Sequence, residues 1–325
     1  MTSSFTPFPP AAGARILSLG GYQPGNVVTN DDLAATVDTT DEWIRSRVGI
    51  VSRRFAGPRE SVPDMAVVGG GKALAASGLS PGDIDLVIVA TCSIEASIPN
   101  ASAVVAHRLG IVAPGAYDLN AACAGFCYAL ANASDAIRAG TARYVLVIGA
   151  EKMTAWIDPT DRSTCIIFAD GAGAVVVGPV ADGEPPGIGP VAWGSAGYMA
   201  EKITIADRNS FMHQEGQAVF RWATTAIPPV AVQACERAGV AVSDLAAFVP
   251  HQANLRIIES IARRLGVPRE RLADDIVQAG NTSSASIPLA LSRMTEHGDL
   301  KPGAAALLLG YGAGMCYAAQ VITVP

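Results

Sequence analysis

Three side chains able to take part in covalent chemistry lie far apart in this sequence, and the first is Cys123. It lies in an apolar, alanine-rich segment, DLNAACAGFCYALANASDAIRAG (118–140), which is typical of a buried helix entered from a strand. A cysteine in the first turn of such a helix feels the positive end of the helix dipole, which favours the thiolate. The segment therefore predicts a nucleophilic cysteine.

Two later segments supply polar partners for this cysteine. His251 lies in VPHQAN (249–254) and Asn281 lies in AGNTSSAS (279–286). Taken singly, His251 could be a satisfied core histidine and Asn281 a turn residue after Gly280. Both fall where predicted strands end or helices begin, which is where α/β enzymes place active residues. A Cys, a His and an Asn at such distances in sequence can meet only through the fold.

The elements that must position these residues follow the same order twice. Each copy begins with the end of a helix, an Asp-bearing turn and a strand. A helix ending in Arg-Leu-Gly follows, and then a short strand that runs into another helix. Each copy closes with a strand and a Gly-rich turn. The shared order predicts two related α/β halves, 1–180 and 181–325, while generic α/β alternation is the alternative. The matched segments are 73–91 and 234–252, 106–111 and 262–267, 117–120 and 275–278, and 144–151 and 305–314.

Other segments complete this outline of the fold. The apolar runs 86–90 and 144–149 have strand length and are typical of parallel strands covered on both faces. Residues 16–22 also read as a strand, and 166–178 reads as two strands joined by a tight glycine turn. The stretch 177–190 is rich in Pro and Gly and predicts the seam between the halves.

Composition limits the class of protein. Half of the 325 residues are hydrophobic and 16% are charged, which suffices for a large buried core. The net charge of −6 argues against a nucleic-acid binder. No apolar run approaches the roughly 18 residues of a membrane span, and the N-terminal segment lacks the pattern of a secretory signal. We therefore expect a cytoplasmic protein with no membrane or nucleic-acid partner.

The cysteines predict neither disulfides nor a metal site. All six lie mostly within apolar segments and are expected to be reduced. Cys123 and Cys127 are one helical turn apart and have no second ligand pair, so structural zinc is not predicted. No GxGxxG opens a helix after the first strand, which argues against a dinucleotide-binding protein. No permanently bound cofactor is expected.

The motifs AACAGF, PHQAN and GNTSSAS, in this order, resemble those of the β-ketoacyl-acyl-carrier-protein synthase III enzymes of the thiolase superfamily. The resemblance extends over nearly the whole chain and implies an α/β protein with the five-layered αβαβα thiolase fold and mixed sheets, assembled as a homodimer. Further matching segments are TTDEWIRSRVGI (39–50), FADGAGAVVVG (168–178), EGQAVFRWA (215–223) and GYGAGM (310–315).

The resemblance also implies a reaction, the condensation of a short, possibly branched acyl-CoA with malonyl-acyl carrier protein to give 3-oxoacyl-acyl carrier protein. Cys123 would carry the acyl group, because exchange between two thioesters is nearly balanced in energy. Decarboxylation of the malonyl group passes through an enolate, whose oxygen needs donors positioned in advance. His251 Nε2 and Asn281 Nδ2 would supply them, and the backbone N–H groups of Cys123 and Ala313 would hold the oxyanion formed at the Cys thioester.

Substrate contacts can be carried over in the same way. Trp43 and Arg47 resemble the family's adenine-stacking pair, with Arg162 expected on the opposite side of the base. Ile98 takes the place of an aromatic residue that limits the acyl pocket in some members, so a longer or branched starter would fit. The residues that match positions beside the pantetheine tunnel are Gln217, Phe220 and Asn254.

A basic helix face predicts where the acyl carrier protein docks. Arg256, Arg263 and Arg264 are seven and eight residues apart, which places them on one face of a helix that begins beside His251. Acyl carrier proteins are acidic, so this face would attract them, although a solvated helix face is the usual meaning of such a run.

Several alternatives stay open. A starter-unit ketosynthase or acyltransferase of a polyketide pathway would use the same Cys-His-Asn site. A thiolase would need a second catalytic cysteine, and Cys316 follows the last Gly-rich turn instead of preceding it. A non-catalytic scaffold with this fold would not need the intact Cys, His and Asn. Val48, Ala313 and a short 197–216 segment depart from the common pattern and leave the acyl specificity open.

Overall fold

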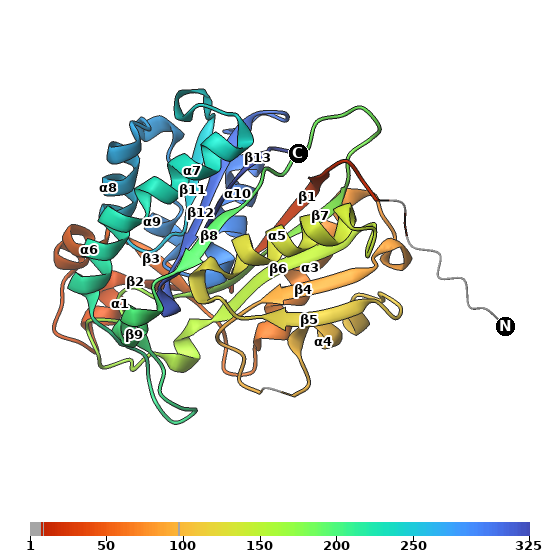
Figure 1. Ribbon diagram of the computed structural model, residues 1–325. Coiled ribbons are helices and arrows are strands. Elements are labelled where there is room, and N and C mark those ends of the chain that lie inside the picture. Colours follow the sequence, from red (N-terminus) through yellow and green to blue (C-terminus); the bar gives the residue numbers. More distant parts are fainter. Residues whose placement is uncertain (1–7, 9, 97) are drawn as a thin grey trace.

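Two β-sheets form the frame of the molecule (Figure 1). The computed structural model describes residues 8, 10–96 and 98–325. The first sheet is mixed: β4 runs parallel to both β5 and β6, whereas β7 runs antiparallel to both β6 and β1. Its strands, in spatial order, are β1 (Ala14–Tyr22), β7 (Asp170–Pro179), β6 (Val145–Lys152), β4 (Leu86–Ala90) and β5 (Gly115–Leu119).

The second sheet repeats this mixture with four strands. β11 is parallel to β12, and β12, β13 and β8 are mutually antiparallel in that order. Its strands are β11 (Ala247–Pro250), β12 (Ala305–Tyr311), β13 (Cys316–Thr323) and β8 (Ala192–Ser195). Two small antiparallel pairs lie outside these sheets: β2 (Asn26–Thr29) with β3 (Ser52–Phe55), and β9 (Ile203–Thr204) with β10 (His213–Gln214).

Helices lie between the two sheets and on their outer faces, which gives five layers. α5 (Gly125–Arg138) and α10 (Ser286–Glu296) form the central layer, because each contacts strands of both sheets. α3 (Val62–Ser77) and α4 (Ala101–Arg108) cover the outer face of the first sheet. α7 (Pro228–Ala238) covers the outer face of the second sheet, and α8 (Leu255–Leu265) packs against α7.

This layering explains why the central strands are apolar without interruption. Side chains alternate between the two faces of a strand. In β6, Val145 and Val147 pack into the core between the sheets, whereas Leu146 and Ile148 pack into the core beneath α3 and α4. A strand buried on both faces therefore needs apolar residues at every position, as the run 86–90 also predicted for β4.

The remaining elements connect these layers. The other helices are α1 (Asn30–Ala34), α2 (Asp41–Val48), α6 (Gly216–Ala226) and α9 (Ile276–Ala279). Short 3₁₀ turns are η1 (Pro81–Asp83), η2 (Ala122–Ala124), η3 (Met153–Trp156), η4 (Gly197–Lys202), η5 (Val242–Asp244), η6 (Arg269–Arg271), η7 (Ser283–Ala285) and η8 (Ala313–Met315). Within the described ranges, no helix is both long enough and apolar enough to cross a membrane.

Two sequence predictions of secondary structure were wrong. Residues 170–178 form a single strand, β7, and residues 166–169 before it are irregular, with Phe168 making one isolated bridge to Asn281. Of residues 275–278, Asp275 caps the short helix α9 and 276–278 lie within it, so the segment is not a strand. Long-range contacts hold this helix, because the Ile276 N–H donates to Gln252 Oε1 at 3.0 Å. Tertiary contacts here override the strand propensity of a short β-branched run.

Candidate active site

Cys123 lies in η2, the tight turn that joins β5 to the N-terminus of α5. Ala122, the residue before it, has φ 45°, a left-handed conformation that costs a non-glycine residue roughly 1–2 kcal/mol. The strained turn directs the strand into the buried helix with the cysteine at the bend. Backbone strain of this kind is concentrated at functional sites.

The turn η8 packs against the cysteine from the second sheet. A Cβ at Gly312 would lie 2.7 Å from Cys123 Cβ and 2.9 Å from its Sγ, so only glycine permits this approach. The backbone N–H groups of Cys123 and Ala313 both lie within hydrogen-bonding reach of the sulfur, where they lower the pKa of the thiol. These are the two N–H groups predicted to hold an oxyanion.

Burial dominates the protonation state of Cys123. Desolvation raises the pKa of its thiol to about 12; the Ser283 hydroxyl lowers the pKa and the nearby Glu151 carboxylate raises it. Desolvation therefore opposes the helix dipole, which was predicted to favour the thiolate. The dipole favours the anion by about 1 kcal/mol, which is less than the cost of desolvating a charge.

His251 follows β11 and is almost completely buried. Desolvation lowers the pKa of its imidazole to about 3, so the ring is neutral at physiological pH. Its Nδ1 lies 2.8 Å from Ser286 Oγ, which also accepts a hydrogen bond from the Gln252 N–H at 3.2 Å. The ring meets Tyr311 edge to face, at 5.5 Å between centroids.

Asn281 is held by its backbone and by its own amide oxygen. Its N–H donates to Ile167 O at 2.9 Å, and its carbonyl accepts from Ala169 N–H at 2.9 Å. Its Oδ1 accepts from the Ser283 N–H at 2.8 Å. The side-chain oxygen is thereby occupied, which leaves the Nδ2 donors as the groups available to a ligand.

One cavity of 460 Å³ brings these residues together. It is lined by Cys123, His251, Asn281 and Ala313, which come from both sheets and both halves of the chain. A cavity of this size is in the range of small-molecule sites in proteins. The fold thus assembles the three predicted catalytic side chains in one place.

An aromatic and cationic cluster lines the same cavity. The guanidinium of Arg162 lies 4.7 Å from the Trp43 ring centre and that of Arg47 lies 5.6 Å from it. Trp43 is positioned by α2, whose capping residue Thr40 accepts a hydrogen bond from the Trp43 N–H at 3.1 Å. Arg162 forms an ion pair with Asp38, at 3.7 Å.

The predicted pantetheine contacts also line this cavity. Gln217 and Phe220 come from α6, and Asn254 caps α8 and donates to Arg47 O at 3.2 Å. Arg256, at the start of α8, lies 5.8 Å from the Phe220 ring centre. Arg263 and Arg264 are exposed further along α8 and do not line the cavity.

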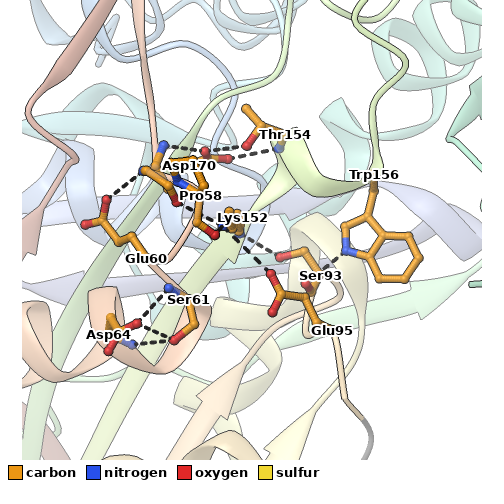
Figure 2. A network of polar contacts seen from close by, with 12 residues as sticks. Pro58, Glu60, Ser61, Asp64, Ser93, Glu95, Lys152, Thr154, Trp156 and Asp170 are labelled. Carbon is orange, nitrogen blue, oxygen red and sulfur yellow. Dashed lines mark hydrogen bonds and ion pairs between the residues drawn. The ribbon is translucent and has the colours of Figure 1, made fainter.

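Ile98 stands apart from the other predicted site residues. Its side chain is 87% exposed, and in a single chain it lines neither the main cavity nor its neighbour. The segment before it is anchored: Figure 2 shows Ser93 Oγ accepting from the Lys152 N–H at 2.8 Å and Ser93 O accepting from Trp156 Nε1 at 2.9 Å. Glu95 forms an ion pair with Lys152 at 3.8 Å. Ser93 and Glu95 are thus anchored, while Ile98 is exposed.

Several residues of the site were missed from sequence. Cys92, two residues after the end of β4, lines the main cavity, as do Ser283 and Tyr311. Cys92 also lines a second cavity of 720 Å³, on the side of Asn120. Cys92 could have been predicted from its position after a parallel strand, because ligands bind at the carboxyl ends of such strands in α/β sheets.

Comparison with known families gives two matches, which together cover about half of the chain. Residues 117–197 match the family described as 3-oxoacyl-[acyl-carrier-protein (ACP)] synthase III, and residues 235–324 match its C-terminal part. The chain is 54% identical to β-ketoacyl-[acyl-carrier-protein] synthase III 4 of Streptomyces coelicolor, over 96% of this chain and 99% of that protein. It is 47% identical to the mycobacterial β-ketoacyl-[acyl-carrier-protein] synthase III of Mycobacterium avium, over 95% of each.

Solved structures agree with these relatives. The priming β-ketosynthase of the R1128 polyketide biosynthetic pathway superposes with a TM-score of 0.94 at 43% identity, over 99% of each chain. The 3-oxoacyl-[acyl-carrier-protein] synthase III of Aquifex aeolicus superposes with a TM-score of 0.91 at 38% identity, over 96% of this chain and 100% of that one. The predicted five-layered fold is confirmed, and the chain belongs to the β-ketoacyl-[acyl-carrier-protein] synthase III family.

Proposed function

We propose that this chain condenses a short acyl-CoA with malonyl-acyl carrier protein to give 3-oxoacyl-acyl carrier protein, and so initiates chain synthesis. The observation that carries the proposal is the convergence of Cys123, His251 and Asn281 on one cavity. A nucleophile and two positioned hydrogen-bond donors are what an acyl transfer followed by an enolate-forming decarboxylation needs.

In the first half-reaction the acyl group moves from CoA to Cys123. Arg47 and Arg162 stack on Trp43 at one part of the cavity, and an adenine ring could take a place among these planar groups. The pantetheine arm would then run along Phe220 toward the sulfur. The N–H groups of Cys123 and Ala313 would stabilise the tetrahedral oxyanion.

In the second half-reaction the malonyl group loses CO₂ beside the acyl-enzyme. The neutral His251 donates through Nε2 when its Nδ1 accepts from the Ser286 hydroxyl, which is 2.8 Å away. Asn281 donates through Nδ2, because its Oδ1 is occupied by the Ser283 N–H. Two neutral donors stabilise the enolate oxygen without protonating the attacking carbon.

The proposal includes the partners of the reaction. The exposed arginines of α8, Arg256, Arg263 and Arg264, would attract an acidic acyl carrier protein to the mouth of the cavity. The six cysteines are all unpaired, which suits a reducing compartment, so we propose a cytoplasmic enzyme.

We also propose a homodimer built on the first sheet. In the described part of the chain β5 pairs only with β4, so its other edge is open to a second strand. Tyr117 on β5, the neighbouring Val112 and the loop residue Ile98 are exposed and apolar. Pairing across β5 would cover this surface and bring the Ile98 of one subunit toward the partner.

A second candidate function keeps the site and changes the pathway. The priming ketosynthase of a polyketide pathway matches 99% of this chain with the same fold. The residues of the cavity serve both roles, so the two functions differ in the carrier protein that delivers the malonyl group. Rates with a fatty-acid carrier and with a polyketide carrier would separate them.

The test of the proposed function separates its two half-reactions. His251→Ala and Asn281→Ala should each slow malonyl decarboxylation roughly 100- to 1000-fold, the usual cost of losing one oxyanion donor, and should keep acyl transfer to Cys123. His107→Ala, on the exposed face of α4, is the matched control and should retain both activities. Equal loss of both half-reactions in the site variants would mean that these residues hold the fold or activate the thiol.

A further inference from the structure

Gln252, which follows His251, has no solvent exposure, and it is not among the residues that line the main cavity. Both donors and the acceptor of its side-chain amide are paired. Its Nε2 donates to Pro250 O at 2.7 Å and to Ala273 O at 3.3 Å, and its Oε1 accepts from the Ile276 N–H at 3.0 Å. Because the partners are two carbonyl oxygens and one N–H, they fix which end of the amide is the oxygen.

These three hydrogen bonds join two segments that carry different site residues. Pro250 ends β11 and directly precedes His251. The other two partners belong to residues 273–281, the segment that contains α9 and ends at Asn281. One buried amide therefore spans from the strand that leads to His251 to the segment that carries Asn281.

The contact made by the Gln252 oxygen lies close to Asn281. Ile276 begins α9, and its carbonyl accepts from the Gly280 N–H at 3.1 Å, directly before Asn281. The start of the segment is tied to β11 separately, by a backbone hydrogen bond of 2.9 Å to Phe248 O. The side chain thus holds the part of the segment that sets the position of the asparagine.

The backbone of Gln252 also acts on the imidazole ring. Its N–H donates to Ser286 Oγ at 3.2 Å, and this oxygen lies 2.8 Å from His251 Nδ1. Since one lone pair of the hydroxyl is occupied, its proton can point at Nδ1, which leaves the ring proton on Nε2. Gln252 therefore contacts both sides of the pair of donors, the histidine through Ser286 and the asparagine through α9.

The ionisable groups next to these contacts are paired or neutral. Arg269 forms an ion pair with Asp274 at 2.6 Å. Arg293 forms one with Asp275, also at 2.6 Å. His251 is neutral, because burial lowers the pKa of its imidazole to about 3. The amide therefore acts through neutral hydrogen bonds.

We propose that Gln252 is a positioning residue for decarboxylation, because its amide sets the spacing between His251 Nε2 and Asn281 Nδ2. The inference rests on the function proposed above, in which these two donors hold the enolate oxygen. A misplacement of about 1 Å in such a site can cost about 100-fold in rate. Acyl transfer uses the backbone N–H groups of Cys123 and Ala313 instead, so Gln252 leaves that half-reaction alone.

The test measures the two half-reactions separately. Acyl transfer is followed by rapid quench of Cys123 labelling with an acyl-CoA, and decarboxylation by release of labelled CO₂ from malonyl-acyl carrier protein. Gln252→Met keeps the length of the side chain and removes its three hydrogen bonds. It should slow decarboxylation about 100-fold and leave acyl transfer unchanged.

Gln252→Glu adds a signature that a general loss of structure would not give. Its protonated carboxyl group can still donate to Pro250 O and accept from the Ile276 N–H, whereas the ionised group would face carbonyl oxygens without solvent. Burial raises the pKa of such a carboxyl group above its ordinary value of about 4.3. Decarboxylation relative to wild type should therefore be restored near about pH 5 and fall toward about pH 9, while relative acyl transfer stays flat.

Gln320→Glu is the matched control. Gln320 is also without solvent exposure, lies on β13 and donates through Nε2 to Cys127 O at 3.3 Å. A carboxyl group there carries the same cost of burial but does not contact the segments of His251 or Asn281. The ratio of the two half-reaction rates should stay at the wild-type value at every pH.

A wild-type ratio in both Gln252 variants would overturn the proposal. Equal loss of both half-reactions in Gln252→Glu would also overturn it, because Gln252 would then hold the fold as a whole and not the two donors. If Gln252→Met does not fold, the pH profile of Gln252→Glu decides alone. A wild-type chain that releases no CO₂ from malonyl-acyl carrier protein would contradict the proposed function itself.

Discussion

Desolvation in the cavity keeps both reactive side chains of the site neutral at rest, although only His251 is fully buried and Cys123 is partly accessible. Desolvation raises the pKa of the Cys123 thiol to about 12 and lowers the pKa of the His251 imidazole to about 3. The Ser286 hydroxyl accepts from the Gln252 N–H and can donate to His251 Nδ1, which places the imidazole proton on Nε2. A neutral site is suited to uncharged thioesters, and it develops charge only when the enolate or thiolate forms.

This protonation state can be measured directly. With ¹³C-labelled histidine, the His251 resonance should not move between about pH 8 and about pH 5. Assignment comes from His251→Ala. A midpoint for His251 near 6.5 would contradict the account of burial.

The lowered pKa of His251 also makes the free energy of unfolding depend on pH. Below about pH 6.5 the unfolded chain binds a proton at this histidine and the folded chain does not, so the free energy of unfolding falls as pH falls toward about 3. The contribution of His251 to this loss is up to about 1.4 kcal/mol per pH unit.

At the residue scale, the sequence revealed the site residues that lie in recognisable motifs. It did not reveal the residues that the fold alone brings to the site. Cys123, His251 and Asn281 were predicted, and the structure brings them to one cavity. Glu151 and Ser283 were missed, because they meet across 132 residues and neither lies in a segment that predicts the other. The raised pKa of the Cys123 thiol could not be predicted, because desolvation depends on the fold around the sulfur.

At the scale of elements, α8 links the active site to the surface. Asn254 caps the helix at one side of the cavity, and the buried residues Ile257, Ile258 and Ile261 pack into the core that α8 shares with α6 and α7. The opposite face carries the exposed Arg256 and its two companions near the C-terminus of the helix. Period-3.6 patterning predicted this helix and its basic face from sequence.

Charge reversal on α8 should weaken use of the carrier protein. Arg256→Glu with Arg264→Glu should raise the KM for malonyl-acyl carrier protein about tenfold through slower association, and should spare decarboxylation of malonyl-CoA. The wild-type KM should rise with salt, since the Debye length is about 8 Å at physiological ionic strength.

Arg138→Glu is the control for this pair, because Arg138 lies at the far end of α5, about 20 Å of helix from Cys123. Steady-state kinetics at several salt concentrations give the comparison. If the wild type, the double variant of α8 and Arg138→Glu had the same KM for malonyl-acyl carrier protein, the arginines of α8 would not contribute to carrier binding.

Secondary structure was predictable where the period of apolar residues was clear. The strand at 86–90 was confirmed to the residue, and the helix after Cys123 was confirmed as α5. The errors at 166–178 and 275–278 lie in short segments whose backbone partners come from the other half of the chain, as the bridge between Phe168 and Asn281 illustrates. No local pattern encodes such a partner.

At the scale of the whole molecule, the two sheets share their central layer. The first sheet draws its strands from residues 14–179 and the second from residues 192–323. α5 contacts strands of the second sheet and α10 contacts β1 and β7 of the first, so each half buries a helix of the other. The division at residues 180 and 181 stays a prediction, since this shared core leaves neither half complete alone.

The exposed Ile98 gives a prediction about the assembly. Ile98→Phe should shift the ratio of kcat/KM toward acetyl-CoA and away from isobutyryl-CoA, if the side chain limits the acyl pocket of a partner subunit. Val232→Phe, exposed on α7 at the outer face of the second sheet, is the control and should leave the ratio unchanged.

Two measurements check this prediction. Sedimentation should give about twice the 33.3 kDa chain mass for both variants. If the ratio of kcat/KM for acetyl-CoA to that for isobutyryl-CoA stays within about twofold of wild type, the change in discrimination is under about 0.5 kcal/mol. Ile98 would then not line the acyl pocket.

The most direct test of the account as a whole is a single turnover followed by intact mass spectrometry. Incubation with isobutyryl-CoA should add one acyl group, and peptide mapping should place it on Cys123 and not on its neighbour Cys92. Addition of malonyl-acyl carrier protein should then restore the original mass and yield one equivalent of 3-oxoacyl-acyl carrier protein, and Cys123→Ala should do neither. An acyl group carried on Cys92, or an acyl-enzyme that malonyl-acyl carrier protein does not discharge, would contradict the account.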